Sequence, residues 1–142
     1  MKILMVDDER PIYTSISILL ELRYPEAELV YSGCGEAGLE MARTAVPDLV
    51  ILDLGLPDIS GFEVLKRLRT FSKVPVMILS VHGQRENMNR ARLLGADDYV
   101  TKPFQPDMLA RIKSIAEKTS TERYSVIRNP LPVLCLYKTE SL

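Results

Sequence analysis

The chain has 142 residues, of which 46% are hydrophobic and 26% charged, a composition that excludes a disordered or collagen-like chain. No apolar run approaches the roughly 20 residues of a membrane-spanning helix, and the first eight residues become acidic too soon for a signal peptide. We therefore expect a cytoplasmic protein with no membrane partner. The net charge of −1 lacks the basic excess of nucleic-acid-binding domains, so we expect no direct nucleic acid binding by this chain.

Short apolar runs alternate with longer segments of helical periodicity. Runs that are apolar at successive positions predict strands buried on both faces, as in a parallel sheet. In chain order, the predicted strands cover 3–6, 29–31, 49–52, 74–79 and 99–100. The predicted helices cover 11–22, 36–44, a segment beginning at Ser60, 84–94 and 106–117. Five strand–helix units in series predict an α/β fold: a doubly wound, five-stranded parallel sheet with five helices.

Local signals set the ends of several predicted helices. Pro11 suits a first turn, where its missing N–H costs nothing. Ser60 and Glu63 have the spacing of a capping box, and Gly95 suits a helix C-terminus. After residue 118 the pattern stops, and the polar segment 119–122 is interpreted as a linker. We expect one domain over 1–118 and a tail over 119–142 that is too short for a second domain.

Polar side chains follow four of the five predicted strands. Asp7 and Asp8 end the first strand, Asp53 ends the third, Ser80 ends the fourth, and Lys102 follows the fifth. Each has a simple structural explanation on its own: Asp8, for example, would cap the first helix. Together they are expected to meet, because ligands of open α/β sheets bind at the carboxyl ends of the strands.

The chemistry of this group points to a cation and a phosphoryl group. Three neighbouring carboxylates repel one another unless a cation lies among them, and Mg²⁺ prefers such oxygen ligands. Asp53 then becomes a nucleophile for phosphorus, since carboxylates form aspartyl phosphates. Lys102 would neutralise the phosphoryl charge, and Ser80 would donate a hydrogen bond to it.

These residues resemble those of a known family, the receiver domain of two-component response regulators. The resemblance covers about residues 1–118 and is closest to the receivers of winged-helix transcription factors. It is carried by Asp7-Asp8-Glu9, Asp53-Leu54-Gly55-Leu56-Pro57, Leu79-Ser80 and Asp97-Asp98-Tyr99-Val100-Thr101-Lys102-Pro103-Phe104.

The resemblance implies a flavodoxin-like fold with strand order 2-1-3-4-5 and a place in a phosphorelay. Asp53 would accept a phosphoryl group from a sensor histidine kinase. Mg²⁺ would be bound by Asp7, Asp8, Asp53 and the backbone carbonyl of Gly55. Lys102 would contact the phosphoryl oxygens and form a cis peptide bond with Pro103.

The same resemblance implies a switch and a dimer. Ser80 would move toward the phosphoryl group and Tyr99 would rotate inward, whereas the simpler interpretations are a loop hydroxyl and a half-buried aromatic ring. The fourth helix, fifth strand and fifth helix would form a homodimer interface through ion pairs, or else an ordinary solvated face. The candidate charged residues are Arg90, Arg92, Asp97, Asp98, Arg111 and Lys113.

Three functions fit these observations. The first is a response regulator receiver, a phosphoacceptor switch rather than a metabolic enzyme, which controls a partner, an output domain or transcription. The second is a Mg²⁺-dependent phosphatase or phosphotransferase, which would need a substrate-enclosing cap and a second acid. The third is an unphosphorylated interaction module, which could dispense with Asp53 and Lys102. The presence of the complete acidic, hydroxyl and basic set favours the first.

Overall fold

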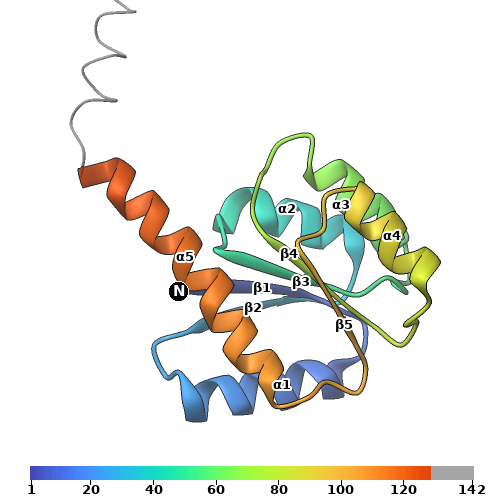
Figure 1. Ribbon diagram of the computed structural model, residues 1–142, viewed down its shortest axis with the longest axis horizontal. Coiled ribbons are helices and arrows are strands. Elements are labelled where there is room, and N and C mark those ends of the chain that lie inside the picture. The colour runs from blue at the N-terminus through green and yellow to red at the C-terminus, as the bar shows by residue number, and fades with distance from the viewer. Residues whose placement is uncertain (129–142) are drawn as a thin grey trace, which may run out of the picture.

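The computed structural model describes residues 1–128, and these form one parallel sheet with helices on both faces (Figure 1). The sheet order is β2-β1-β3-β4-β5, which confirms the predicted fold and strand order. Its strands are β1 (Lys2–Val6), β2 (Glu28–Ser32), β3 (Leu49–Leu52), β4 (Val76–Ser80) and β5 (Asp98–Thr101). Each neighbouring pair is parallel, so the carboxyl ends of all five strands lie along one edge.

Five helices complete the strand–helix alternation. They are α1 (Arg10–Arg23), α2 (Gly35–Ala45), α3 (Gly61–Leu68), α4 (Arg85–Leu93) and α5 (Asp107–Arg128). Helices α1 and α5 cover one face of the sheet, and α2, α3 and α4 cover the other (Figure 1). No helix within residues 1–128 is both long and apolar enough to span a membrane.

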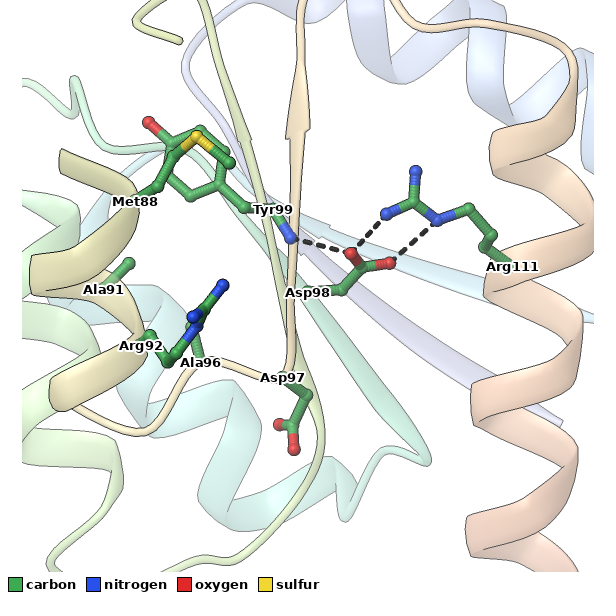
Figure 2. Close-up of a pocket in the computed structure, with 8 residues that line it drawn as sticks. All are labelled: Met88, Ala91, Arg92, Ala96, Asp97, Asp98, Tyr99 and Arg111. Carbon is green, nitrogen blue, oxygen red and sulfur yellow. Dashed lines mark hydrogen bonds and ion pairs between the residues drawn. The ribbon is translucent and has the colours of Figure 1, made fainter. Parts of the chain in front are cut away.

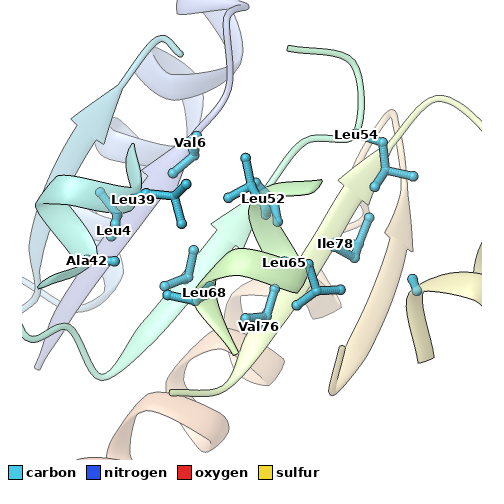
Figure 3. Close-up of a cluster of buried hydrophobic side chains, with 13 residues drawn as sticks. Leu4, Val6, Leu39, Ala42, Leu52, Leu54, Leu65, Leu68, Val76 and Ile78 are labelled. Atoms are coloured by element: carbon cyan, nitrogen blue, oxygen red, sulfur yellow. The ribbon is translucent and has the colours of Figure 1, made fainter. Parts of the chain in front are cut away.

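The central strands are buried on both faces, which explains why they are apolar at successive positions. Alternate side chains of β1 and β3 face opposite sides: Leu4 and Leu52 pack toward α2 and α3, whereas Met5 and Ile51 pack toward α1 and α5. Figure 3 shows the first of these clusters, in which side chains of α2 and α3 meet those of β1, β3 and β4. Each fully buried aliphatic side chain contributes about 1.5–3 kcal/mol, so two full cores hold the edge of the sheet in place.

Most predicted ends agree with the structure, and the differences have local causes. The hydroxyl of Ser60 accepts a hydrogen bond from the Glu63 amide at 3.2 Å, as an N-cap does, and Gly95 ends α4 with φ 103°. Strand β4 begins two residues later than predicted. Pro75 has no N–H to donate, and the Val74 carbonyl is already engaged at 2.7 Å by the Arg69 guanidinium.

The interpretation of 119–122 as a linker is wrong, because α5 continues through these residues to Arg128. The hydroxyl of Thr119 donates a hydrogen bond to the Ile115 carbonyl at 3.2 Å. A threonine of the predicted linker is thereby accommodated within the helix. The predicted boundary at residue 118 therefore does not coincide with a change of secondary structure. The apolar run 133–137 lies outside the described residues.

Candidate functional site

Four carboxylates meet at the carboxyl edge of the sheet. Asp7 and Asp8 follow β1, Glu9 precedes α1, and Asp53 follows β3. One carboxylate oxygen from each lies within 4.8 Å of those of the others. Asp7 and Asp53 are 1% and 6% exposed, whereas Asp8 and Glu9 are open to solvent. The site therefore has a buried floor of two acids and an accessible rim of two more.

The backbone fixes the buried acids through strand-like hydrogen bonds. The Asp7 amide donates to the Ser32 carbonyl at 3.1 Å, and the Asp53 amide donates to the Val6 carbonyl at 2.9 Å. One Asp7 oxygen, Oδ1, also accepts the Glu9 amide at 2.8 Å. Asp8 does not cap α1 as its simpler interpretation requires, because Glu9 occupies the N-cap position and forms no side-chain cap.

Within residues 1–128, Lys102 contributes the only ammonium group that lies at this acidic cluster. Its Nζ lies 2.9 Å from Asp7 Oδ2, 2.9 Å from Glu9 Oε1 and 3.6 Å from Asp53 Oδ2. Its backbone amide donates to the Ser80 carbonyl at 2.7 Å, which ties the segment after β5 to the end of β4. The predicted cis peptide bond between Lys102 and Pro103 is present.

Burial dominates the electrostatics of the two floor acids. Loss of solvation raises the pKa of Asp7, and the charge of Asp53 adds to this effect. Loss of solvation likewise raises the pKa of Asp53, against the lowering effects of Lys102 and of a hydrogen bond from the Gly55 backbone. Burial alone would lower the pKa of Lys102, but its acidic neighbours Glu9, Asp7 and Asp53 raise it. With one ammonium facing four carboxylates, the pocket keeps an excess of negative charge.

This excess fits a hard divalent cation. The buried Asp7 Oδ2 has the Lys102 ammonium 2.9 Å away, and this ammonium also lies close to Glu9 and Asp53. Carboxylate oxygens within 4.8 Å of one another are a suitable donor set for Mg²⁺, which keeps several of its waters. Asp7, Asp8, Glu9 and Asp53 are therefore chemically suited to such an ion.

The segment after Asp53 approaches α3 so closely that only glycine fits at position 61. A Cβ on Gly61 would lie 2.3 Å from the Asp53 carbonyl oxygen and 2.6 Å from the Leu54 Cα. The Gly61 amide instead donates to the Leu54 carbonyl at 2.9 Å. Gly55 faces open space, since a Cβ there would meet nothing within 4 Å. The segment is thus held tightly at its ends and is open beside Asp53.

Ser80 and Tyr99 lie where the sequence analysis placed them, and both contact the loop after β4. Ser80 is 1% exposed, and its hydroxyl accepts the His82 amide at 3.1 Å. The Tyr99 hydroxyl donates to the His82 carbonyl, and its half-exposed ring lies beside Met88 of α4 (Figure 2). The loop residue His82 therefore links the two predicted switch residues through its backbone.

Five of the six charged residues predicted to pair across a dimer have partners within the chain. Arg111 of α5 forms a two-point ion pair with Asp98 of β5 (Figure 2). Asp97 accepts Arg69 at 3.2 Å and the Val76 amide at 2.8 Å. Further contacts within the chain place Arg90 over the Phe62 ring and Lys113 beside Glu117. A dimer through this face would therefore need to exchange or share these pairs.

Glu9 is the site residue that sequence reasoning missed. It appeared only as the third letter of Asp7-Asp8-Glu9, yet it contacts Lys102 at 2.9 Å and belongs to the acidic cluster. Its position directly after the strand end was the available signal. The sequence could not show that the chain turns there so that Glu9 faces back toward the fifth strand.

A doubly wound α/β sheet with strand order 2-1-3-4-5 has the flavodoxin-like fold, and here its carboxyl edge carries an acidic pocket that contains Lys102. Residues 3–113 match the response regulator receiver domain family, and this chain belongs to that family. The resemblance found in the sequence is confirmed.

Individual relatives agree with this assignment. The cell cycle response regulator CtrA of Brucella ovis is 39% identical over 130 residues, which cover 89% of this chain and 55% of CtrA. The chain thus spans about half the length of the curated relatives it matches. The receiver domain of the Francisella response regulator 1452 superimposes with a TM-score of 0.77 at 29% identity, over 83% of this chain and 98% of that domain.

A second solved structure is the BeF3-activated N-terminal receiver domain of Klebsiella pneumoniae RstA. It gives a TM-score of 0.76 at 28% identity, over 82% of this chain and 98% of that one. The similarity extends over almost the whole of both solved domains.

Proposed function

We propose that this chain is a phosphoacceptor switch in which Asp53 receives a phosphoryl group from a sensor histidine kinase. The observation that carries this proposal is the placement of Asp53 beside both an acidic cluster and an ammonium: its Oδ2 lies 3.6 Å from Lys102 Nζ. Asp53 also neighbours an open loop, so a donor can approach it from solvent. Membership of the receiver family supports the same conclusion.

In the transfer step, a carboxylate oxygen of Asp53 attacks the phosphorus of a phosphohistidine. The new O–P bond forms as the P–N bond breaks, and the electron pair of the P–N bond stays on the imidazole nitrogen. Asp53 reacts as the ionised carboxylate, and the Lys102 ammonium, 3.6 Å from its Oδ2, favours that form. A phosphohistidine that is protonated on its other ring nitrogen leaves as neutral imidazole, so this chain need not supply an acid for the leaving group.

The neighbours of Asp53 stabilise the charge that gathers on the phosphoryl oxygens. Lys102, held near Asp7 and Glu9, offers its ammonium to one oxygen. When bound by Asp7, Asp8, Asp53 and the Gly55 carbonyl, Mg²⁺ supplies further neutralisation of this charge. Glu9 adds a solvent-exposed acid that would hold an ion or its waters. Catalysis here is positioning and electrostatics, as in other phosphoryl transfers.

The switch would begin at the hydroxyl of Ser80. When the Ser80 hydroxyl turns to donate to a phosphoryl oxygen, it moves away from the His82 amide, whose N–H it accepts, and the loop after β4 can rearrange. The Tyr99 hydroxyl loses its acceptor on His82 and the ring can turn inward. A local change of hydrogen bonds then alters the α4–β5–α5 face, where a cytoplasmic partner, a second copy or an output domain would read it.

The test is labelling with acetyl phosphate and Mg²⁺, followed by intact-mass spectrometry. The wild-type chain is expected to gain one phosphoryl group, and Asp53→Asn is expected to gain none. Lys102→Met serves as a second variant, which keeps the nucleophile but removes the ammonium and should slow the labelling. Equal labelling of the wild type and Asp53→Asn would refute the assignment.

A further inference from the structure

Asp58 connects the segment that follows Asp53 to the N-terminus of helix α2 through hydrogen bonds. It lies between β3 and α3, five residues after Asp53. Its Oδ1 accepts the Gly35 amide at 2.8 Å, and its Oδ2 accepts the Glu36 amide at 2.8 Å. Both carboxylate oxygens are therefore committed to the first turn of α2, across 22 and 23 residues of sequence.

These two bonds replace a cap that α2 lacks locally. Cys34 occupies the N-cap position in an extended conformation but forms no side-chain cap. The hydrogen bonds from the Glu36 and Gly35 amides lower the pKa of Asp58 to about 2, so the carboxylate is ionised at neutral pH. A negative charge at a helix N-terminus stabilises the helix. Here the charge is the Asp58 carboxylate, which comes from the segment between β3 and α3.

The packing around this contact leaves little freedom. A Cβ on Gly35 would lie 2.6 Å from Ile59 Cγ1 and 2.8 Å from Val64 Cγ2, so α2 sits directly on the residue after Asp58. At the other end of the segment, Asp53 is tied to β1 and Leu54 to Gly61.

Between these two fixed points, residues 55–57 form an arch. Gly55 and Pro57 are exposed and Leu56 is partly exposed, and nothing packs where a Gly55 side chain would be. Within the arch, Leu56 packs against the hydrophobic core under α2 and α3, so this contact and the far anchor at Asp58 together hold its shape. The arch carries the Gly55 backbone, which bonds to Asp53 and whose carbonyl is an expected Mg²⁺ ligand.

We propose that Asp58 is a positioning residue for phosphoryl transfer: by binding the N-terminus of α2 it fixes the arch over 55–57 and with it the Gly55 backbone beside Asp53. This inference rests on the proposed function for its catalytic consequence. The structural part, a tether that orders Gly55, stands on the two hydrogen bonds and the packing at Gly35.

The experiment compares the wild-type 142-residue chain with Asp58→Ala. Groups that orient metal ligands typically change metal affinity by about 10–100-fold when removed, so the Mg²⁺ dissociation constant should rise about 10-fold. Calorimetric titration with Mg²⁺ measures this. Amide hydrogen exchange at Gly55 should become faster, and labelling by acetyl phosphate at fixed, subsaturating Mg²⁺ should become slower.

A second substitution separates tethering from helix capping. In Asp58→Ala/Cys34→Ser, the serine supplies a local N-cap, so α2 regains stability while the arch stays untethered. We expect the urea midpoint to recover toward the wild type and the Mg²⁺ affinity and Gly55 exchange to stay impaired. Glu36→Gln is the matched control. It breaks the Glu36–Arg67 ion pair, with contacts of 2.8 and 2.9 Å, but leaves the backbone bonds to Asp58 intact, so Mg²⁺ affinity should not change.

Two outcomes overturn the proposal. In one, Asp58→Ala keeps the wild-type Mg²⁺ affinity and Gly55 exchange. In the other, Cys34→Ser restores both, which would make Asp58 a helix cap and nothing more. If the wild type itself neither binds Mg²⁺ nor accepts a phosphoryl group, the proposed function fails, and Gly55 exchange in the double variant still decides whether Asp58 orders the arch.

Discussion

Substitution of Gly61 by alanine should damage the site without touching a functional side chain. The new Cβ would lie 2.3 Å from the Asp53 carbonyl oxygen, and ordinary contact begins at about 3.4 Å, so the two backbones must separate by about 1 Å. A displacement of that size costs about 100-fold in rate when it misplaces a reacting group. We therefore expect acetyl phosphate to label Gly61→Ala about 100-fold more slowly than the wild type.

The same clash sets the expected loss of stability. Overpacking costs about 1–3 kcal/mol, with the upper end expected because both obstructing atoms are backbone. Gly61 is the first residue of α3, so alanine there regains less than the roughly 1 kcal/mol of helix propensity that it regains in a helix interior. Urea unfolding should show a net loss of at least about 2 kcal/mol.

Gly55→Ala is the control for Gly61→Ala, because its Cβ meets nothing within 4 Å and its stability should change by less than about 0.5 kcal/mol. A Gly61→Ala protein with wild-type stability and labelling rate would refute the claim that this contact positions Asp53.

Three other perturbations test the pocket and the switch. Mg²⁺ at 100 times its dissociation constant should raise the free energy of unfolding by about 2.7 kcal/mol, and Asp8→Asn should remove most of this gain; an equal gain in both proteins would argue against the metal site. Because burial raises the pKa of Asp53, its contribution to stability is present at acid pH and is lost as the pH rises through that pKa. Without Mg²⁺, Asp53→Asn should thus have a higher free energy of unfolding in urea than the wild type at neutral pH, and the difference between the two proteins should become smaller as the pH is lowered. A difference that grows as the pH is lowered would contradict this prediction. Beryllium fluoride with Mg²⁺ should shift the wild type toward a dimer in sedimentation velocity and leave Asp53→Asn unchanged, and an unchanged wild-type monomer would count against the α4–β5–α5 interface.

The fold could be predicted from sequence because its signals are local and repeated. Apolar runs such as 49–52 mark strands buried on both faces, and the structure has β3 at the same residues. The end of α5 could not be predicted in this way. A polar run such as 119–122 suits a linker and an exposed helix equally well, and the choice of helix depends on continuation from the buried turn at Ile112 and Ala116.

The sequence predicts which residues meet at the edge of the sheet, because this follows from the topology. It predicts less well which side chains contact one another there, because this depends on the direction of each side chain. Parallel strands bring their carboxyl ends to one edge, so Asp7, Asp53 and Lys102 were expected to meet, and they do. The contact of Glu9 with Lys102 depends on the turn into α1, which no residue pattern specifies. The bonds of Asp58 to α2 join residues more than 20 positions apart, and periodicity carries no information about such a contact.

The central claim is that Asp53, rather than another acid of the pocket, carries the phosphoryl group. Proteolysis of the acetyl-phosphate-treated chain, followed by fragmentation mass spectrometry, locates the added group directly. The account predicts a single modified residue, Asp53, in the peptide that spans β3 and the start of α3. A phosphoryl group on Asp7, Asp8 or Glu9, with Asp53 unmodified, would contradict it.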